Sequence, residues 1–297
     1  MKYSIGNHIV EIEGAELVDA VAALNSFKPF ITDDGGKAVV QFSYEGNLSN
    51  AEFALAANGK FLYSSENDGV LSELYELGGD RYLQRMRRSG KEFRGTGCCY
   101  DDELYQVVDR SGGRAAIYGT LDLQMLRFAL WIGYGILTSN LKTIAIHSSC
   151  IVYRGKAVIF LGESGTGKST HTRLWRENIM GASLLNDDSP IIRIGEGVEV
   201  YGSPWSGKTP CYRQEVYPLA AIVRLYQAPF NKIEKLPVLG AYGALHPSCP
   251  PDFAYSADLY DGISSTIGKI LERVPVYMMG CLPDADAART SCEKIFG

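Results

Sequence analysis

The residues from Gly162 to Ser169 read GESGTGKS and match the pattern GxxxxGK[ST] in full. In this pattern, backbone N–H groups surround phosphate oxygens, the lysine contacts the β- and γ-phosphates, and the final hydroxyl can ligate Mg²⁺. An apolar run enters the loop and a helical pattern leaves it, which is the context the chemistry needs. The alternative is a glycine-rich turn with no ligand. We expect the phosphates of a nucleotide to be bound by Gly162, Glu163, Ser164, Gly165, Thr166, Gly167, Lys168 and Ser169.

Two adjacent carboxylates, Asp187 and Asp188, close the segment LLNDD downstream of the loop. The intervening chain has room for one helix and a turn, so both carboxylates should reach the end of the next strand. Neighbouring side chains on a strand point to opposite faces, which suits two separate roles, one at a metal and one at an incoming nucleophile. The alternative is an acidic turn before Ser189 and Pro190.

Four further side chains are candidates whose alternatives stay open. His147 lies on the expected strand beside the loop strand, and Lys208 lies in a Gly- and Pro-rich stretch where a cation could reach a transferring phosphoryl group. His171 and Trp175 are four residues apart and could line the nucleotide site or simply pack within the core. Residues 81–94 carry six cations, which could contact an acidic peptide or a phosphate, or could protect an edge strand.

The elements that position these residues divide the chain near residue 115. Residues 1–115 predict a small β-rich domain with strands at 3–5, 8–12, 38–42, 52–56, 61–64, 82–86 and 104–108, and a helix at 15–25. Residues 116–297 predict an α/β domain that begins with a long apolar helix at 119–140. There we expect strands at 144–153, 157–161, 183–185, 191–194, 198–201, 220–226, 232–236 and 274–279, and helices at 168–179, 254–272 and 284–295.

Composition excludes several classes of function. The net charge of −5 gives no general attraction to nucleic acid or to anionic membranes. The longest apolar run, residues 128–141, is too short to span a bilayer, and the N-terminal residues show no signal-peptide pattern. Seven cysteines without a CxxC pair predict reduced thiols. We therefore expect a cytoplasmic protein with no nucleic-acid or membrane partner.

The order His147, hairpin, GESGTGKS and NDD resembles the catalytic domain of HPr kinase/phosphorylase, whose nucleotide site is also similar to that of ATP-dependent phosphoenolpyruvate carboxykinase. The wider pattern, with YGSPWSGK after LNDD, resembles bacterial HPr-kinase-related proteins. The resemblance covers about residues 145–206 and implies a P-loop core with a mixed sheet. The chain departs from HPr kinases by lacking their Glu-Ile-Arg-Gly segment and their later Gly- and Arg-rich signature.

Carried over residue by residue, the resemblance implies that the segment from Gly162 to Thr170 holds ATP, that Asp187 accepts the proton of the substrate hydroxyl and that His147 lies near Asp187. It implies that Ser169 and Asp188 contribute to the Mg²⁺ site. From the motif and the loop themselves, we expect Lys168 and Lys208 to offset phosphate charge. The resemblance also implies a homo-oligomer.

These observations predict an ATP- and Mg²⁺-dependent kinase that phosphorylates a hydroxyl, of a Ser or Thr in a protein or peptide. The alternatives are a small-molecule kinase or carboxykinase-like phosphotransferase, and a nucleotide-dependent regulatory module that transfers nothing.

Overall fold

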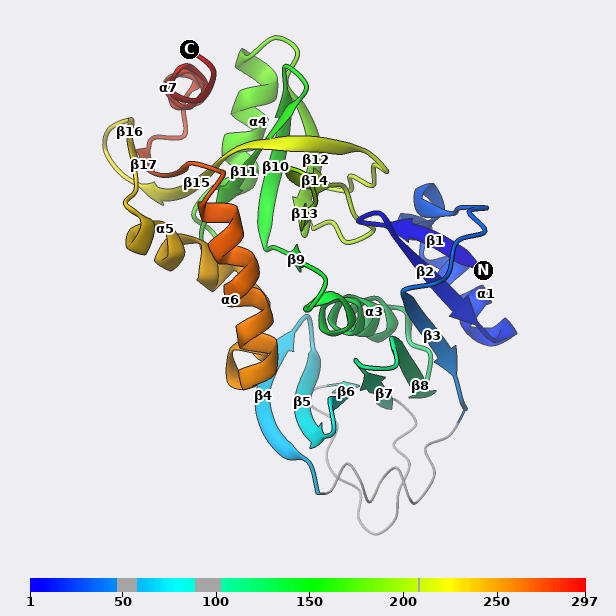
Figure 1. Cartoon of the computed structure of the whole chain (residues 1–297). Coiled ribbons are helices and arrows are strands. Elements are labelled where there is room, and N and C mark those ends of the chain that lie inside the picture. Colours follow the sequence, from blue (N-terminus) through cyan, green and yellow to red (C-terminus); the bar gives the residue numbers. More distant parts are fainter. Residues whose placement is uncertain (47–57, 89–102, 208) are drawn as a thin grey trace. The chain divides into compact units, whose positions relative to one another are not determined.

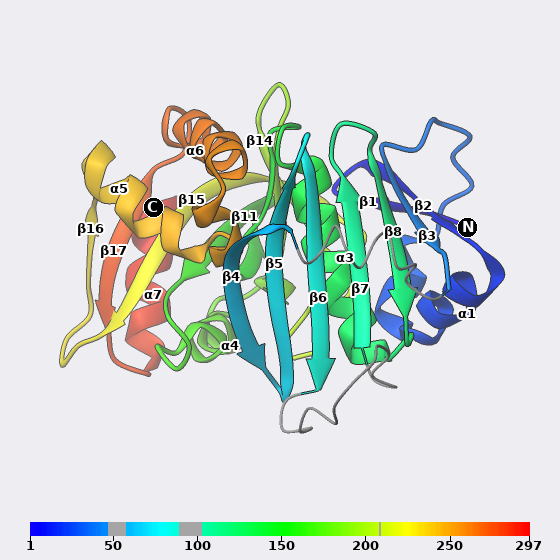
Figure 2. The same ribbon diagram turned by 90° about the horizontal axis from the view of Figure 1, so that it is seen from below.

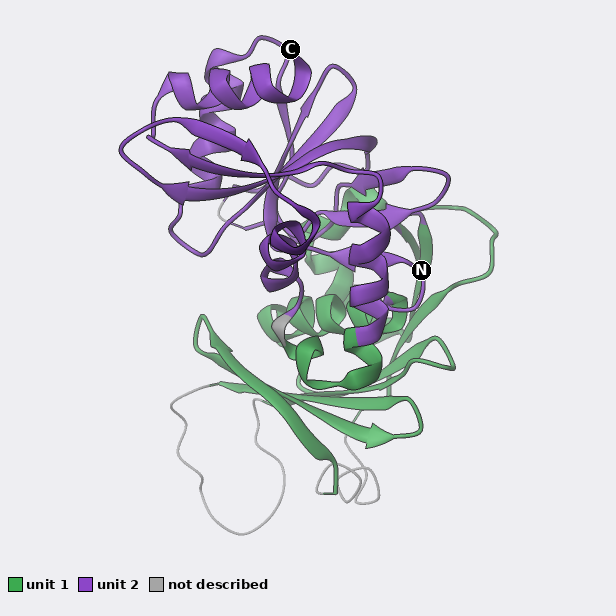
Figure 3. Ribbon diagram, turned by 60° about the vertical axis from the view of Figure 1, so that its left-hand side comes forward, with its two compact units in different colours: residues 1–4, 8–138, 252–260 green, residues 5–7, 139–251, 261–297 purple. Residues whose placement is uncertain are grey.

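A computed structural model describes residues 1–46, 58–88, 103–207 and 209–297 of the chain (Figure 1). Residues 1–4, 8–138 and 252–260 form one unit, and residues 5–7, 139–251 and 261–297 form the other (Figure 3). The expected mixed α/β fold is confirmed, with one eight-stranded and one nine-stranded sheet. The described helices include none that is long and apolar enough to cross a membrane.

The first unit is built on the eight-stranded sheet, whose spatial order is β1-β2-β3-β8-β7-β6-β5-β4. From β4 to β8, each strand is the antiparallel neighbour of the next one in the chain. Strand β8 then pairs with β3 in parallel (Figure 2). The strands are β1 (Lys2–Ile5), β2 (His8–Glu13), β3 (Val40–Tyr44), β4 (Lys60–Asn67), β5 (Val70–Gly78), β6 (Arg81–Arg88), β7 (Glu103–Asp109) and β8 (Arg114–Gly119). The helical elements described before residue 139 are α1 (Ala15–Ala23), the 3₁₀ segment η1 (Asn25–Phe30) and α3 (Leu123–Thr138).

The sequence pattern did not predict β5 and β8, and the expected strand at 52–56 lies outside the described residues. The first unit also extends past the boundary expected near residue 115, because α3 contacts β7, β6 and β3. Gly133 allows this close approach, since a Cβ atom there would lie 2.8 Å from Phe42 Cε1 and 2.6 Å from Gln106 Nε2. The apolar helix at the head of the expected second domain therefore packs on the first sheet.

The second unit is built on the nine-stranded sheet, with β12-β10-β11-β15-β14-β13-β9 as its main path and β17 and β16 continuing from β15. Its strands are β9 (Thr143–Ala145), β10 (Ser148–Tyr153), β11 (Lys156–Leu161), β12 (Ser183–Asp188), β13 (Ile191–Ile194), β14 (Val198–Tyr201), β15 (Val216–Gln227), β16 (Lys232–Lys235) and β17 (Val276–Cys281). Among the described residues, the remaining helical elements are α4 (Lys168–Asn178), α5 (Val238–Leu245), η2 (His246–Ser248), η3 (Pro251–Tyr255), α6 (Ala257–Leu271) and α7 (Ala285–Phe296), of which η3 and the start of α6 fall within residues 252–260 of the first unit. Of these, α5 was not predicted.

Strand direction brings four carboxyl ends to one edge of the second sheet. Strand β11 is parallel to β15, and β15 is parallel to β17. Strand β10 is antiparallel to both β11 and β12, so β12 also points the same way as β11. In open α/β sheets this edge is where ligands bind.

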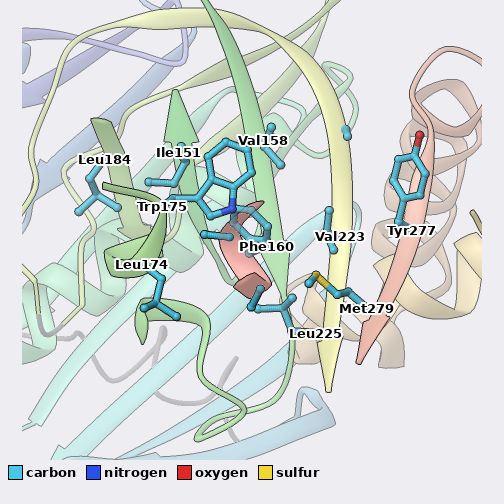
Figure 4. Close-up of a cluster of buried hydrophobic side chains, with 13 residues drawn as sticks. Ile151, Val158, Phe160, Leu174, Trp175, Leu184, Val223, Leu225, Tyr277 and Met279 are labelled. Carbon is cyan, nitrogen blue, oxygen red and sulfur yellow. The ribbon is translucent and has the colours of Figure 1, made fainter. Parts of the chain in front are cut away.

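A buried apolar cluster holds α4 and α7 against this sheet (Figure 4). Trp175 of α4 is fully buried and packs with Phe160 of β11 at a ring-centroid distance of 5.8 Å. Asp284 precedes helix α7 and caps it, because its carboxylate accepts the N–H of Ala287 at 3.0 Å. The N-terminus of α4 is therefore fixed at the carboxyl edge of β11.

Candidate functional site

The predicted phosphate loop lies between β11 and α4, as the sequence analysis expected. Gly167 caps α4 with φ of 103°, a left-handed conformation that glycine adopts without strain. A Cβ atom on Gly162 would lie 2.4 Å from Thr166 Oγ1, so this position has no room for a side chain. The first N–H groups of a helix lack partners within the helix, and an anion can supply them. The loop therefore ends at the N-terminus of α4, with glycines at the two positions described above.

Lys168 reaches back across this loop. Its Nζ donates to the carbonyl oxygens of Gly162 at 2.8 Å and Glu163 at 3.3 Å. Burial lowers the pKa of Lys168, while the nearby Asp188 and Asp187 act in the opposite direction. The ammonium group therefore lies inside the loop and within electrostatic reach of both carboxylates.

Asp187 is bound by two hydroxyl groups. Ser169 Oγ donates to Asp187 Oδ1 at 3.1 Å, and Ser149 Oγ donates to the same oxygen. Ser149 and Asp187 are direct partners in the β10–β12 ladder, so their side chains share a face. Asp187 is only 5% exposed. The hydroxyl that completes the loop motif is thus paired with Asp187, whereas the resemblance had joined it to Asp188.

Asp188 pairs with His147 instead. His147 Nδ1 lies 3.1 Å from Asp188 Oδ1, and these side chains are 49% and 35% exposed. The sequence analysis placed His147 beside Asp187, and the structure corrects that pairing. The reason is strand alternation, because consecutive residues of β12 point to opposite faces and the α4 face is taken by Asp187. The reachable carboxylate is therefore Asp188.

Asn186 is a positioning residue that the sequence analysis did not single out. Its Nδ2 donates to Ser203 O at 3.3 Å, Ser203 Oγ at 3.2 Å and Trp205 O at 3.1 Å, and its Oδ1 accepts the N–H of Ser189 at 2.9 Å. The available signal was an amide between the apolar pair Leu184 and Leu185 and the two carboxylates of the same strand.

The segment that Asn186 holds runs beside the two carboxylates. The N–H of Gly207 donates to Asp187 O at 2.7 Å, and Ser206 forms an isolated bridge with Asp188. Lys208, the predicted phosphate-contacting cation, lies outside the described residues. The YGSPWSGK motif is therefore attached to LNDD at both Asn186 and Asp187.

The other candidates have structural partners. His171 Nε2 and Trp175 Nε1 lie 3.1 and 2.9 Å from Ser291 Oγ of α7, so these two residues belong to the core and not to a nucleotide wall. Burial lowers the pKa of His171 to about 4. Within residues 81–94, the described part is β6, which is an inner strand and not the expected edge strand. There Arg88 pairs with Asp122 of the same unit.

The donors present fit Mg²⁺. Two oxygens bound to an octahedral ion at about 2.1 Å are about 3.0 Å apart, which matches the 3.1 Å between Ser169 Oγ and Asp187 Oδ1. The described residues contain no group of three or more His, Cys, Asp or Glu side chains that could hold a metal. Mg²⁺ commonly takes one or two protein ligands and completes its shell with phosphate oxygens and water.

No family model matches the chain, and no curated protein matches it. Among solved structures, the chain is similar to the Hpr(Ser) kinase/phosphatase from Coxiella burnetii, with 12% sequence identity and a TM-score of 0.30 over 51% of this chain and 97% of that one. This is a structural similarity over half of the chain.

Proposed function

We propose that this protein is an ATP- and Mg²⁺-dependent phosphotransferase that transfers the γ-phosphoryl group to a hydroxyl. The main support is the end of β12, where Asp187 and Asp188 each pair with a different side chain, both within electrostatic reach of Lys168. Ser169 with Asp187 has the donors of a magnesium site, and His147 with Asp188 has the donors of a base. A loop that only sensed a nucleotide would not need the second pair.

The nucleotide would be held by the backbone of residues 162–170 and by Lys168. Ser169 and Asp187 would hold Mg²⁺, which offsets negative charge on the phosphate oxygens when bound. Lys168 contributes a fixed positive charge on the same side of the loop. Its reduced exposure to water makes that charge act more strongly on a phosphate than it would in solvent.

We assign the base to Asp188 and the metal ligand to Asp187, the reverse of the roles that the resemblance implies. Asp187 is buried and already accepts two hydroxyl hydrogen bonds. Asp188 is exposed enough for an acceptor hydroxyl to reach one of its oxygens. That oxygen would take the hydroxyl proton as the new O–P bond forms and the bond from the γ-phosphorus to its bridging oxygen breaks, with ADP leaving. His147, with its proton on Nδ1, donates to the other oxygen and orients the carboxylate.

The acceptor we propose is the hydroxyl of a Ser or Thr in a protein or peptide. A small-molecule hydroxyl is the alternative that uses the same groups. Protein and small-molecule acceptors both need a base beside the γ-phosphate, so the assay below tests both classes of hydroxyl.

The test is phosphoryl transfer from γ-labelled ATP to pooled peptides and pooled small-molecule alcohols, with and without Mg²⁺. We expect Mg²⁺-dependent labelling that falls by about 10²–10⁴ in Asp188→Asn, the usual contribution of a general base. Asp286→Asn, an exposed carboxylate on α7, is the matched control and should keep wild-type transfer. Nucleotide binding without transfer to any hydroxyl would contradict the proposal and favour a regulatory module.

A further inference from the structure

Arg224 is a cation that the loop motif does not include, yet the fold brings it to the loop. It lies on β15, where its Cα pairs in the parallel ladder with Leu161, the residue immediately before the loop. Its neighbours Val223 and Leu225 point into the core with Trp175 (Figure 4). Successive side chains on a strand alternate, so Arg224 points to the opposite face of the sheet.

Two contacts fix the guanidinium of Arg224 at the start of the loop. Its Nη1 donates to Ala244 O, in the last turn of α5, at 3.0 Å. Its Nη2 lies 3.8 Å from Glu163 Oε1. The Arg224 side chain is 18% exposed and the Glu163 side chain is 85% exposed. The arginine is therefore anchored, while its carboxylate partner is free to leave into water.

The charges around the loop favour a second cation. Three carboxylates, those of Glu163, Asp187 and Asp188, accompany Lys168, and a nucleoside triphosphate adds further negative charge. Both Arg224 and the two aspartates act on the pKa of Lys168, so these groups share one electrostatic environment. An arginine supplies a planar, permanently charged fork that bonds two acceptors at once, such as a carbonyl and a phosphate oxygen.

We propose that Arg224 is a second phosphate-binding residue of this site. Glu163 pairs with the side of the Arg224 guanidinium that does not bond Ala244 O, until a nucleotide polyphosphate displaces the carboxylate. The inference rests on the proposed function, because it needs a polyphosphate in the loop. Ala244 O keeps one side of the fork in place while the other side bonds a non-bridging phosphate oxygen. Glu163 is then a competitor of the ligand and not one of its side-chain contacts.

The test measures Mg·ATP affinity by calorimetry for the wild type, Arg224→Gln and Glu163→Gln. Gln at position 224 keeps N–H donors for Ala244 O but removes the charge, and we expect affinity to fall about tenfold or more. Removing the competing carboxylate should tighten binding by up to about fivefold, the usual scale of an exposed ion pair. Opposite changes of Mg·ATP affinity in the two variants would support the competition, because a merely structural Arg224–Glu163 contact would make Mg·ATP binding weaker in both.

Arg273→Gln is the control, since the exposed side chain of this arginine bonds only the backbone of Glu196 among the contacts described. If Arg224→Gln binds Mg·ATP as Arg273→Gln does, the inference is overturned and the proposed function stands. If the wild type binds no nucleotide, the proposed function fails first. Should Arg224→Gln not fold, Glu163→Gln decides alone: tighter binding supports the inference, and unchanged or weaker binding overturns it.

Discussion

Replacing Asn186 with alanine should destabilise the second unit and detach the segment beside the two carboxylates. Asn186 is fully buried, and so is Ser203, while Trp205 and Ser189 are each 3% exposed. The Asn186→Ala change removes the acceptor of the Ser189 N–H and a donor to two backbone carbonyl oxygens. Water cannot replace these partners without opening the structure.

The magnitude follows from those lost partners. A buried polar group left without a hydrogen bond costs about 1–3 kcal/mol, and Ser203 Oγ retains a hydrogen bond to Trp205 O that limits the loss there. We therefore expect the free energy of unfolding to fall by about 3–5 kcal/mol. Asn186→Asp should be at least as harmful at neutral pH, because a carboxylate would face the carbonyl oxygens of Ser203 and Trp205.

Urea unfolding followed by circular dichroism measures this change. The control is Asn178→Ala, because Asn178 Nδ2 makes a single hydrogen bond to Leu174 O at the partly buried end of α4. We expect that control to lose less than about 1 kcal/mol. An Asn186→Ala protein as stable as Asn178→Ala would refute the argument that this amide holds the 203–207 segment in place.

Three further predictions test the site and its support. Asp187→Asn should weaken both the affinity for Mg·ATP and the Mg²⁺ dependence of binding, whereas Asp188→Asn should keep that affinity and lose phosphoryl transfer. Titration calorimetry measures the affinities, and transfer assays measure the rates. The reverse pattern would show that the roles of the two aspartates are interchanged. The folded-state pKa of His171, about 4, lies below its unfolded value near 6.5, so the unfolded chain binds the proton first and stability falls as pH drops from 6.5 towards 4. That loss is about 2–3 kcal/mol at pH 4.5, and urea unfolding of His171→Gln should lack it; equal pH profiles would disprove the assignment. Burial raises the pKa of Asp252 from 3.8 to about 6, so the unfolded chain releases this proton first, and stability falls as pH rises from about 4 to about 6. The full loss is present at pH 8, where Asp252→Asn should be more stable than the wild type by on the order of 2 kcal/mol, and no gain there would count against a buried carboxylate.

The parts of the site that are local in sequence could be predicted, and the parts that depend on strand register could not. Residues 162–169 form a strand end, a loop and a helix start within one short segment, so their types and spacing suffice. The pairing of Ser149 with Asp187 depends on the register between β10 and β12, and the hydrogen bond from Ser169 to Asp187 depends on α4 packing beside β12. The motif alone fixed neither which carboxylate faces α4 nor which one meets His147.

The same limit explains the cation that the sequence analysis missed. Arg224 is remote from the loop in sequence and reaches Glu163 only because β15 pairs in parallel with β11. No short motif encodes that pairing. Likewise, the apolar pattern of α3 predicted its helix correctly, but only tertiary packing determines that it covers β7 of the first sheet.

Titration of the wild-type protein and of Lys168→Ala with ATP, in the presence and absence of Mg²⁺, tests the central claim most directly. The loop would keep its backbone donors in the variant but lose the charge that meets the β- and γ-phosphates. We predict that the wild type binds ATP in a Mg²⁺-dependent manner and that affinity falls by more than about tenfold in Lys168→Ala. A wild-type protein that binds no ATP, or a variant whose affinity stays within about twofold of the wild type, would contradict the assignment of this loop as a nucleotide site.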